Sequence, residues 1–185
     1  GHVITKNGKV KTECFVADLP EDISNPKVNS PLEGTPVTRP GVPEGIHQRR
    51  ITNTENGMEG PRNWLRTTPD GSLIAFLMKD KAGIVQVFGV SPNGGEIIQL
   101  TFNKFPVQGQ FNFSPDGEFI AYPAQNSVFL QKLHCEKPDR ITPEFIDSEK
   151  LAGGVVWSNN GKMLAYNRYV QNSSGSHIQI FLLKV

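Results

Sequence analysis

The chain has 185 residues and a formal net charge of +1 at pH 7, with 19 Lys and Arg against 18 Asp and Glu. This balance provides no polybasic surface for nucleic acid, and no apolar run approaches the roughly 20 residues of a membrane span, so we expect neither partner. The 18 Gly and 14 Pro exceed average usage, and with 11 Phe they favour short strands joined by turns. The composition disfavours a helical bundle, a collagen-like rod, a coiled coil and a disordered acidic chain.

The first fifty residues predict a hairpin followed by a long loop. Asn7-Gly8 lies between two strand-like runs, 2–5 and 11–19, and Asn-Gly is the strongest short hairpin signal. Prolines then occur at positions 20, 26, 31, 36, 40 and 43. Because proline cannot donate a hydrogen bond to a sheet ladder, we expect 20–45 to form an extended loop and 46–52 to return as a closing strand.

Three segments repeat without gaps, namely 64–76, 110–122 and 154–166. Each contains a Pro-Asp-Gly or Asn-Asn-Gly turn, with the glycines at 71, 117 and 161. Asp or Asn can bond to the nearby backbone and Gly accepts a positive φ, so each turn is predicted to join two antiparallel strands. Repeat lengths of 46 and 44 residues with about four strands per unit are typical of propeller blades.

A second marker lies in the same register, because Ile-Thr or Leu-Thr ends successive units at Thr52, Thr101 and Thr142. We therefore predict an all-β fold, a partial β-propeller of about three to four four-stranded blades, the first and last incomplete. The predicted units are 1–52, 60–101, 107–142 and 151–185. Open blade faces would be apolar, so we expect the remaining blades of the propeller or another protein chain as a partner.

The repeats resemble the WD40-like repeats of TolB-like propellers, and the whole chain resembles a bacterial family of uncharacterised proteins described as Tol biopolymer transporter-like. The segments that carry this resemblance are ECFVADLP (13–20), PLEGT (31–35), QRRIT (48–52), PRNWLR (61–66), IAFLMKD (74–80) and GGE (94–96). The resemblance implies a longer protein with further blades before the first hairpin. It supplies no reaction and no catalytic residues.

Motifs for catalysis are absent from the sequence: there is no phosphate loop, no His-Glu-x-x-His, no Cys-x-x-Cys and no Gly-x-Ser-x-Gly. We predict no catalytic residues, no metal site and no cofactor. Asp70 and Asp116 are interpreted as turn caps. The four histidines, at 2, 47, 134 and 177, are far apart in sequence, and their convergence on a metal through folding is left open beside a surface or edge position.

Polar residues at the inner strands are the candidate ligand-binding residues, because the first strand of each blade lines the central channel. They are Arg62, Asn63 and Arg66 in one blade and Gln108, Gln110 and Asn112 in the next. Two arginines near a channel mouth can hold a carboxylate or phosphate in a bidentate manner. The alternative is that these side chains hydrate the channel or pair with neighbouring carboxylates.

Aromatic residues near the inner strands are interpreted as packing between blades, with an aromatic ligand platform as the alternative. They are Trp64, Phe111, Phe113 and Trp157. Cys14 and Cys135 have no metal-ligand spacing and are expected to be two buried free thiols rather than one disulfide.

The sequence thus favours a non-catalytic binding or scaffold module that engages a protein, a peptide or a small anionic ligand at the channel mouth. The alternative is part of a propeller enzyme, a carbohydrate lyase or a peptidase-associated propeller, whose active site needs blades outside this chain. The sequence leaves the compartment open.

Overall fold

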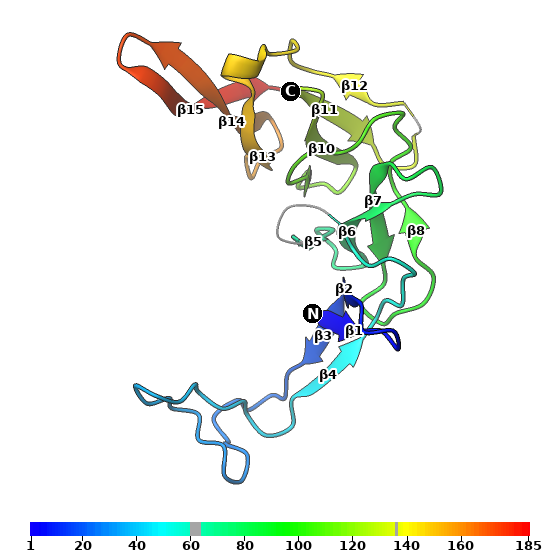
Figure 1. Ribbon diagram of the computed structural model, residues 1–185, viewed down its shortest axis with the longest axis vertical. Coiled ribbons are helices and arrows are strands. Elements are labelled where there is room, and N and C mark those ends of the chain that lie inside the picture. The colour runs from blue at the N-terminus through cyan, green and yellow to red at the C-terminus, as the bar shows by residue number, and fades with distance from the viewer. Residues whose placement is uncertain (60–63, 136) are drawn as a thin grey trace.

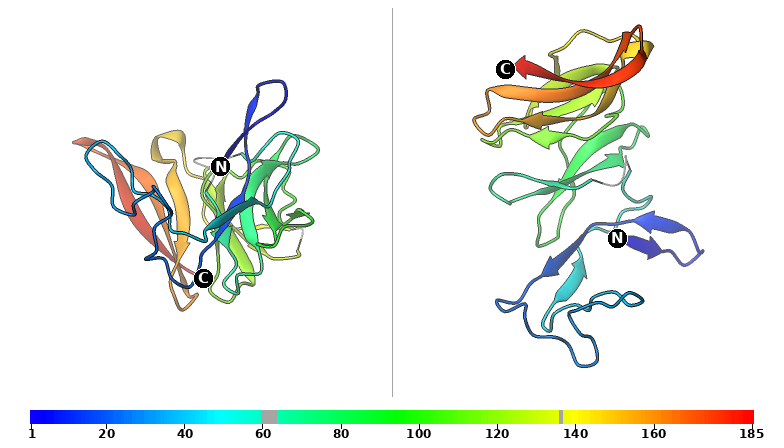
Figure 2. Two further views of the ribbon diagram at one scale, coloured as in Figure 1. Left: turned by 90° about the horizontal axis from the view of Figure 1, so that it is seen from below. Right: turned by 90° about the vertical axis from the view of Figure 1, so that its left-hand side faces the viewer.

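The computed structural model describes residues 1–59, 64–135 and 137–185. These residues form β-strands and one short 3-10 turn, η2 (Asp147–Glu149). The sheets follow one another along an arc, with β5 and β13 on its concave side and β8 on its convex side (Figure 1), and a second view shows them stacked face to face (Figure 2). The predicted all-β partial propeller is confirmed. In the described part of the chain, no helix has the length and apolarity needed to cross a membrane.

The two central sheets each have four antiparallel strands in sequence order. The first consists of β5 (Arg66–Thr67), β6 (Ile74–Lys79), β7 (Val85–Val90) and β8 (Ile98–Gln99). The second consists of β9 (Asn112–Phe113), β10 (Phe119–Ala124), β11 (Ser127–Lys132) and β12 (Asp139–Arg140).

The C-terminal sheet has three described strands, and its last two form a long hairpin. They are β13 (Leu151–Trp157), β14 (Met163–Asn172) and β15 (Gly175–Lys184).

At the N-terminal end, β1 (His2–Ile4) pairs with β2 (Val10–Thr12), and β3 (Phe15–Asp18) pairs with β4 (His47–Arg50). The single strand expected over 11–19 is therefore wrong. It divides because its partner changes: the Glu13 backbone bonds to Gly1 at 2.9 Å, whereas the Cys14 N–H donates to Thr52 Oγ1 at 2.8 Å. Between β3 and β4 the proline-rich loop makes only isolated bridges and projects from the arc (Figure 1).

The three repeated turns have the same backbone geometry. φ is +70°, +74° and +69° at Gly71, Gly117 and Gly161, a left-handed conformation that glycine adopts without strain. In each turn a side-chain oxygen accepts the backbone N–H of the residue two positions later, at 3.0 to 3.1 Å, and the acceptors are Asp70, Asp116 and Asn160. The capping role expected for Asp70 and Asp116 is what the structure shows.

Hydrogen bonds within the turns also lower the pKa values of the two carboxyl groups. Hydrogen bonds from Thr68 and Ser72 lower the pKa of Asp70 to about 2, and those from Ser114 and Glu118 lower the pKa of Asp116. Both carboxylates are therefore ionised and engaged within their own turns.

A buried threonine lies at the end of each repeat, and its hydroxyl accepts a backbone N–H that would otherwise need a carbonyl acceptor. The Thr52 hydroxyl accepts the N–H of Cys14, just before β3, at 2.8 Å. The Thr101 and Thr142 hydroxyls accept the N–H groups of Val87 on β7 and Val128 on β11, both at 2.9 Å. The second marker in the sequence is thus a side-chain extension of the strand ladder.

In the first central sheet Thr101 belongs to a buried polar network. Gln86 Oε1 accepts from Thr101 Oγ1 at 2.8 Å and from the Asn103 N–H at 3.1 Å, and Gln86 Nε2 donates to the Asn103 carbonyl at 2.7 Å. The Tyr122 hydroxyl of the next blade lies 3.0 Å from Asn103 Oδ1, and burial raises the pKa of Tyr122 to about 12. Gln131 Nε2 donates to the carbonyl of Leu100 at 3.3 Å, so the network joins the two blades.

The N-terminal unit has a charged version of the same network. Glu13 takes the place of Gln86, and its carboxylate accepts from Thr52 Oγ1 at 2.5 Å and from the Thr54 N–H at 2.9 Å. Lys11 Nζ lies 2.9 Å from Glu13 Oε1. Burial favours the neutral acid, but the hydrogen bonds from Thr52, Lys11 and Thr54 outweigh it and lower the pKa of Glu13.

Apolar side chains fill the spaces between neighbouring sheets. Phe111 and Phe113 are buried in the cluster between the central blades, as expected, and Trp157 is half-buried with its Nε1 donating to the Asn112 carbonyl at 3.3 Å. Trp64 is 37% exposed, so the prediction that it packs in the core between blades is wrong. It precedes the two-residue strand β5 and stacks with Arg66, whose Cζ lies 5.2 Å from its ring.

Both cysteines are free, in agreement with the sequence. Cys14 is buried beside β4, but Cys135 is exposed, so the expectation that both are buried is wrong for Cys135. The reason is the turn after β11, where His134 has a φ of +65° and the chain leaves the sheet before Cys135.

Glu13→Gln tests the charged network. The Glu13 pKa is lowered on folding, so its contribution to stability is complete above the unfolded value of about 4.5 and is lost as the pH falls through the folded value. We expect the free energy of unfolding, measured by urea titration with circular dichroism, to fall by about 1–2 kcal/mol less in E13Q than in the wild type on acidification to about pH 3. Exposed Glu21→Gln is the control, and equal pH dependence of E13Q and wild type would contradict this account.

Thr101→Val tests the strand-end threonine. The substitution keeps the shape and leaves the Val87 N–H and Gln86 Oε1 without this buried partner. We expect a loss of about 2 kcal/mol in the free energy of unfolding at pH 7, measured by the same urea titration. Exposed Thr67→Val on β5 is the matched control; a loss no larger than in T67V would show that the hydroxyl does not stabilise the blade.

Candidate functional site

A hollow of about 320 Å³ lies between the second central sheet (β9–β12) and the C-terminal sheet (β13–β15), where the chain enters their inner strands. Its lining comes from three places: the segment before β9, the turn after β10 and the start of β13. The lining residues are Gln108, Gly109, Gln110, Pro123, Asn126, Leu151 and Gly153.

Two glycines allow the walls of this hollow to approach each other. A Cβ on Gly109 would lie 2.5 Å from Pro123 Cγ and 2.9 Å from the Gly153 carbonyl oxygen. A Cβ on Gly154 would lie 2.5 Å from Gln110 Cβ. All three distances are far below van der Waals contact, so the close approach requires glycine at positions 109 and 154. The Gln108 N–H donates to the Pro123 carbonyl at 2.9 Å and anchors the first wall.

The polar side chains of the hollow are uncharged amides. Asn126 has a φ of +50° and its Nδ2 donates to Asp147 Oδ1 at 3.2 Å, which holds it at the turn between β10 and β11. The Gln108 and Gln110 side chains form no hydrogen bond to any residue that the structure describes, so their donors and acceptors face solvent or a ligand. Amide groups of this kind suit the alternating N–H and C=O groups of a peptide or other neutral polar molecule.

The predicted site residues are only partly brought together. Gln108 and Gln110 line the hollow, whereas Asn112 lies on β9 outside it. Arg66 bends along its own strand, where its Nη1 donates to the Leu65 carbonyl at 2.9 Å. Arg62 and Asn63 lie outside the described residues.

The sequence reasoning missed Asn126 and Pro123. A signal for Asn126 was present, because Gln125-Asn126 stands between two strand-like runs and both residues have positive φ, as in a two-residue hairpin turn. Pro123 lies inside β10, and nothing in its local sequence points to a pocket wall.

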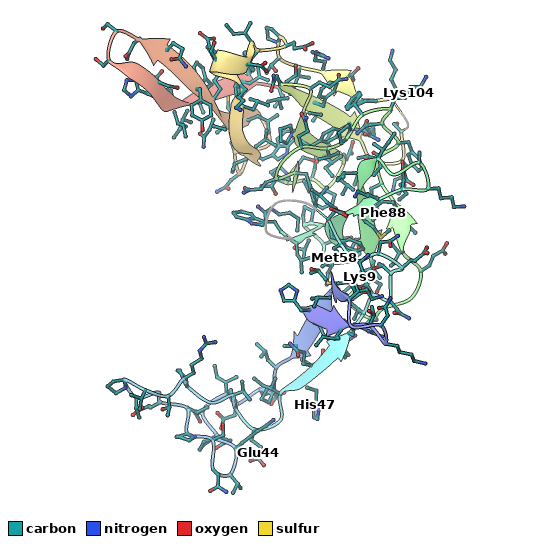
Figure 3. All side chains as sticks on the ribbon, in the orientation of Figure 1. Lys9, Glu44, His47, Met58, Phe88 and Lys104 are labelled. Carbon is teal, nitrogen blue, oxygen red and sulfur yellow. The ribbon has the colours of Figure 1, made fainter. Side chains whose placement is uncertain are left out.

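Metal-ligating side chains do not gather elsewhere in the described ranges, where no group of three or more His, Cys, Asp or Glu could hold a metal ion. His47 lies near one end of the arc (Figure 3) and His177 lies on β15 in the sheet at the other end. Asp70, Asp116 and His134 line a second hollow of about 280 Å³, but both carboxylates are used within their turns.

No family model matches the chain. The chain is 36% identical over 173 residues to the uncharacterized protein YidR of Escherichia coli K12, a match that covers 90% of this chain and 41% of that protein. It therefore spans about two fifths of this relative's length.

Two solved structures are similar in fold. TolB from Acinetobacter baumannii has a TM-score of 0.52 at 23% identity, over 73% of this chain and 32% of that one. Oligogalacturonate lyase from Vibrio parahaemolyticus has a TM-score of 0.52 at 15% identity, over 86% of this chain and 36% of that one. The likeness to a TolB-like propeller expected from the repeats is confirmed in the fold, and the chain is similar to an uncharacterised protein of the kind that the sequence motifs indicated.

Proposed function

We propose that the chain is a non-catalytic binding module that engages a peptide segment of another protein at the hollow between the second central sheet and the C-terminal sheet. The observation that carries this proposal is the pair of unengaged amides, Gln108 and Gln110, beside a close glycine-lined backbone. An amide both donates and accepts, which matches the main chain of an extended peptide.

The described lining also favours a neutral ligand over an anion. It contains no arginine, lysine or histidine, and Arg66 is directed to its own strand. Binding of a small anion would therefore depend on Arg62, which lies outside the described residues. The experiment below separates the two ligand classes.

A selection of phage-displayed random heptapeptides on the immobilised chain tests this proposal. We expect the enriched peptides to bind the wild type, in isothermal titration calorimetry, on the order of tenfold more tightly than the Gln108→Ala/Gln110→Ala variant, because two amide hydrogen bonds are lost. Gln48→Ala/Gln179→Ala removes two exposed amides elsewhere and is the matched control.

Equal affinity for wild type and Q108A/Q110A would overturn the peptide site. Enrichment of acidic peptides whose binding is lost in Arg62→Ala and Arg66→Ala, but not in Q108A/Q110A, would instead support the anionic ligand.

A partner for the outer face of the C-terminal sheet is a second part of this proposal. Val156 pairs with Ala165, and Ala165 with Leu182, so these side chains share one face with Ile180. Val156, Ile180 and Leu182 are 57%, 73% and 69% exposed. The sheet's last strand, β15, has no described neighbour on its outer edge. We propose that another propeller blade covers this face, which agrees with the greater length of the YidR relative.

Ile180→Lys/Leu182→Lys tests the uncovered face. We expect the isolated wild-type chain to associate with rising concentration in light scattering, because the apolar face is exposed, and the double variant to remain at 20.4 kDa. Val28→Lys in the proline-rich loop, where Val28 is 88% exposed, is the control. A wild-type chain that stays monomeric at about 100 μM would contradict the proposal.

A further inference from the structure

A further hollow, of about 590 Å³, lies on the outer rim of the arc and takes no part in the site described above. It is formed by the loop after β8, the turn after β10 and the segment before β12. The lining residues are Phe102, Asn103, Lys104, Phe105, Gln125, Lys137 and Pro138. Its volume falls within the roughly 300–1,000 Å³ of small-molecule sites.

The apolar part of this hollow is held in place by the blade beneath it. Phe105 packs on Phe129 with ring centroids 4.9 Å apart, and Arg140 lies over the same Phe129 ring at 5.2 Å. Phe102 is 50% exposed, so it offers a free aromatic face. Because Phe105 is fixed by the core, the wall exists before any ligand binds.

The charged side chains that line the hollow, Lys104 and Lys137, are both positive. Lys104, which projects from the outer rim (Figure 3), and Lys137 form no ion pair with any described residue, and no described lining residue is acidic. Glu136 lies outside the described residues. Two ammonium groups without an ion-pair partner among the described residues, at the edge of an apolar hollow, complement a ligand that has an apolar body and a negative charge.

The two amide residues of the lining, Asn103 and Gln125, are held by hydrogen bonds. The Gln86 side chain holds the Asn103 backbone, Tyr122 contacts its Oδ1, and its buried Nδ2 has no hydrogen-bond partner among the described residues. Arg140 Nη2 donates to Gln125 Oε1 at 2.8 Å and fixes that amide. Asn103 and Gln125 are thus held in fixed positions at the wall of the hollow.

We propose that this outer-rim hollow binds a small carboxylic acid with an aromatic or branched aliphatic body. The apolar body lies against Phe102, Phe105 and Pro138, and the carboxylate lies between Lys104 and Lys137. A single negative charge fits better than a phosphate dianion, because the larger charge loses more hydration beside an apolar wall. The inner hollow has no charged lining and no aromatic wall, so the two sites differ in ligand chemistry.

Two probes of the same shape test this proposal, 3-phenylpropionate and the neutral 3-phenylpropan-1-ol. Saturation-transfer NMR with the 185-residue chain gives the affinity of each. We expect the acid to bind about fivefold more tightly than the alcohol, since exposed ion pairs contribute modestly. In Lys104→Gln/Lys137→Gln the two affinities become equal, whereas Phe102→Ala weakens both.

The control is Lys162→Gln/Lys184→Gln, which removes two exposed lysines from the C-terminal sheet. Equal affinities of acid and alcohol for the wild type would overturn the proposal, as would an unchanged preference in K104Q/K137Q. Loss of the preference in the control variant would show a general effect of net charge and would overturn it as well. Matching circular dichroism spectra for all variants establish that folding is unchanged.

Discussion

The stacking of these sheets depends on a buried hydrogen bond between a threonine hydroxyl and the third strand of its own blade. Thr101 accepts the Val87 N–H and donates to Gln86, whose amide also holds the backbone of Asn103. Asn103 in turn contacts Tyr122 of the next blade. One side-chain network therefore sets the position of the outer strand, the course of the loop that follows it and the contact with the neighbouring sheet. Leaving any of these buried polar groups unpaired costs more than the bond itself contributes.

Both hollows lie along the segment that this network controls. The outer one begins at Phe102, directly after Thr101, and the inner one begins at Gln108, where the same loop reaches the next inner strand. The loop is anchored between them by Phe105, which packs on Phe129. The scaffold thus fixes two hollows of different character, one lined by neutral amides and one by aromatic rings and lysines.

The N-terminal unit shows that the same architecture tolerates a charge in this network. Glu13, paired with Lys11, accepts hydrogen bonds in the same way as the neutral Gln86 does in the next blade. Hydrogen bonds from Thr52, Lys11 and Thr54 keep the carboxylate ionised in spite of its burial, so we expect this unit to be more sensitive to acid than its neighbour. The fold similarity to TolB and to a lyase does not decide between binding and catalysis, because a propeller supports both and function resides in the site.

The sequence by itself determined the repeat, the turns and the all-β class, because each of those features depends on residues close together in the chain. Asp70 bonds to a backbone group two residues away, and the glycine at 71 needs only its own φ. The tertiary structure decided the rest. Gly109 and Gly153 form one hollow because two segments far apart in sequence approach within contact distance. Arg66 bonds to the neighbouring Leu65 carbonyl, and Cys135 is exposed because the chain turns at His134. The order of residue types along the chain does not indicate either conformation.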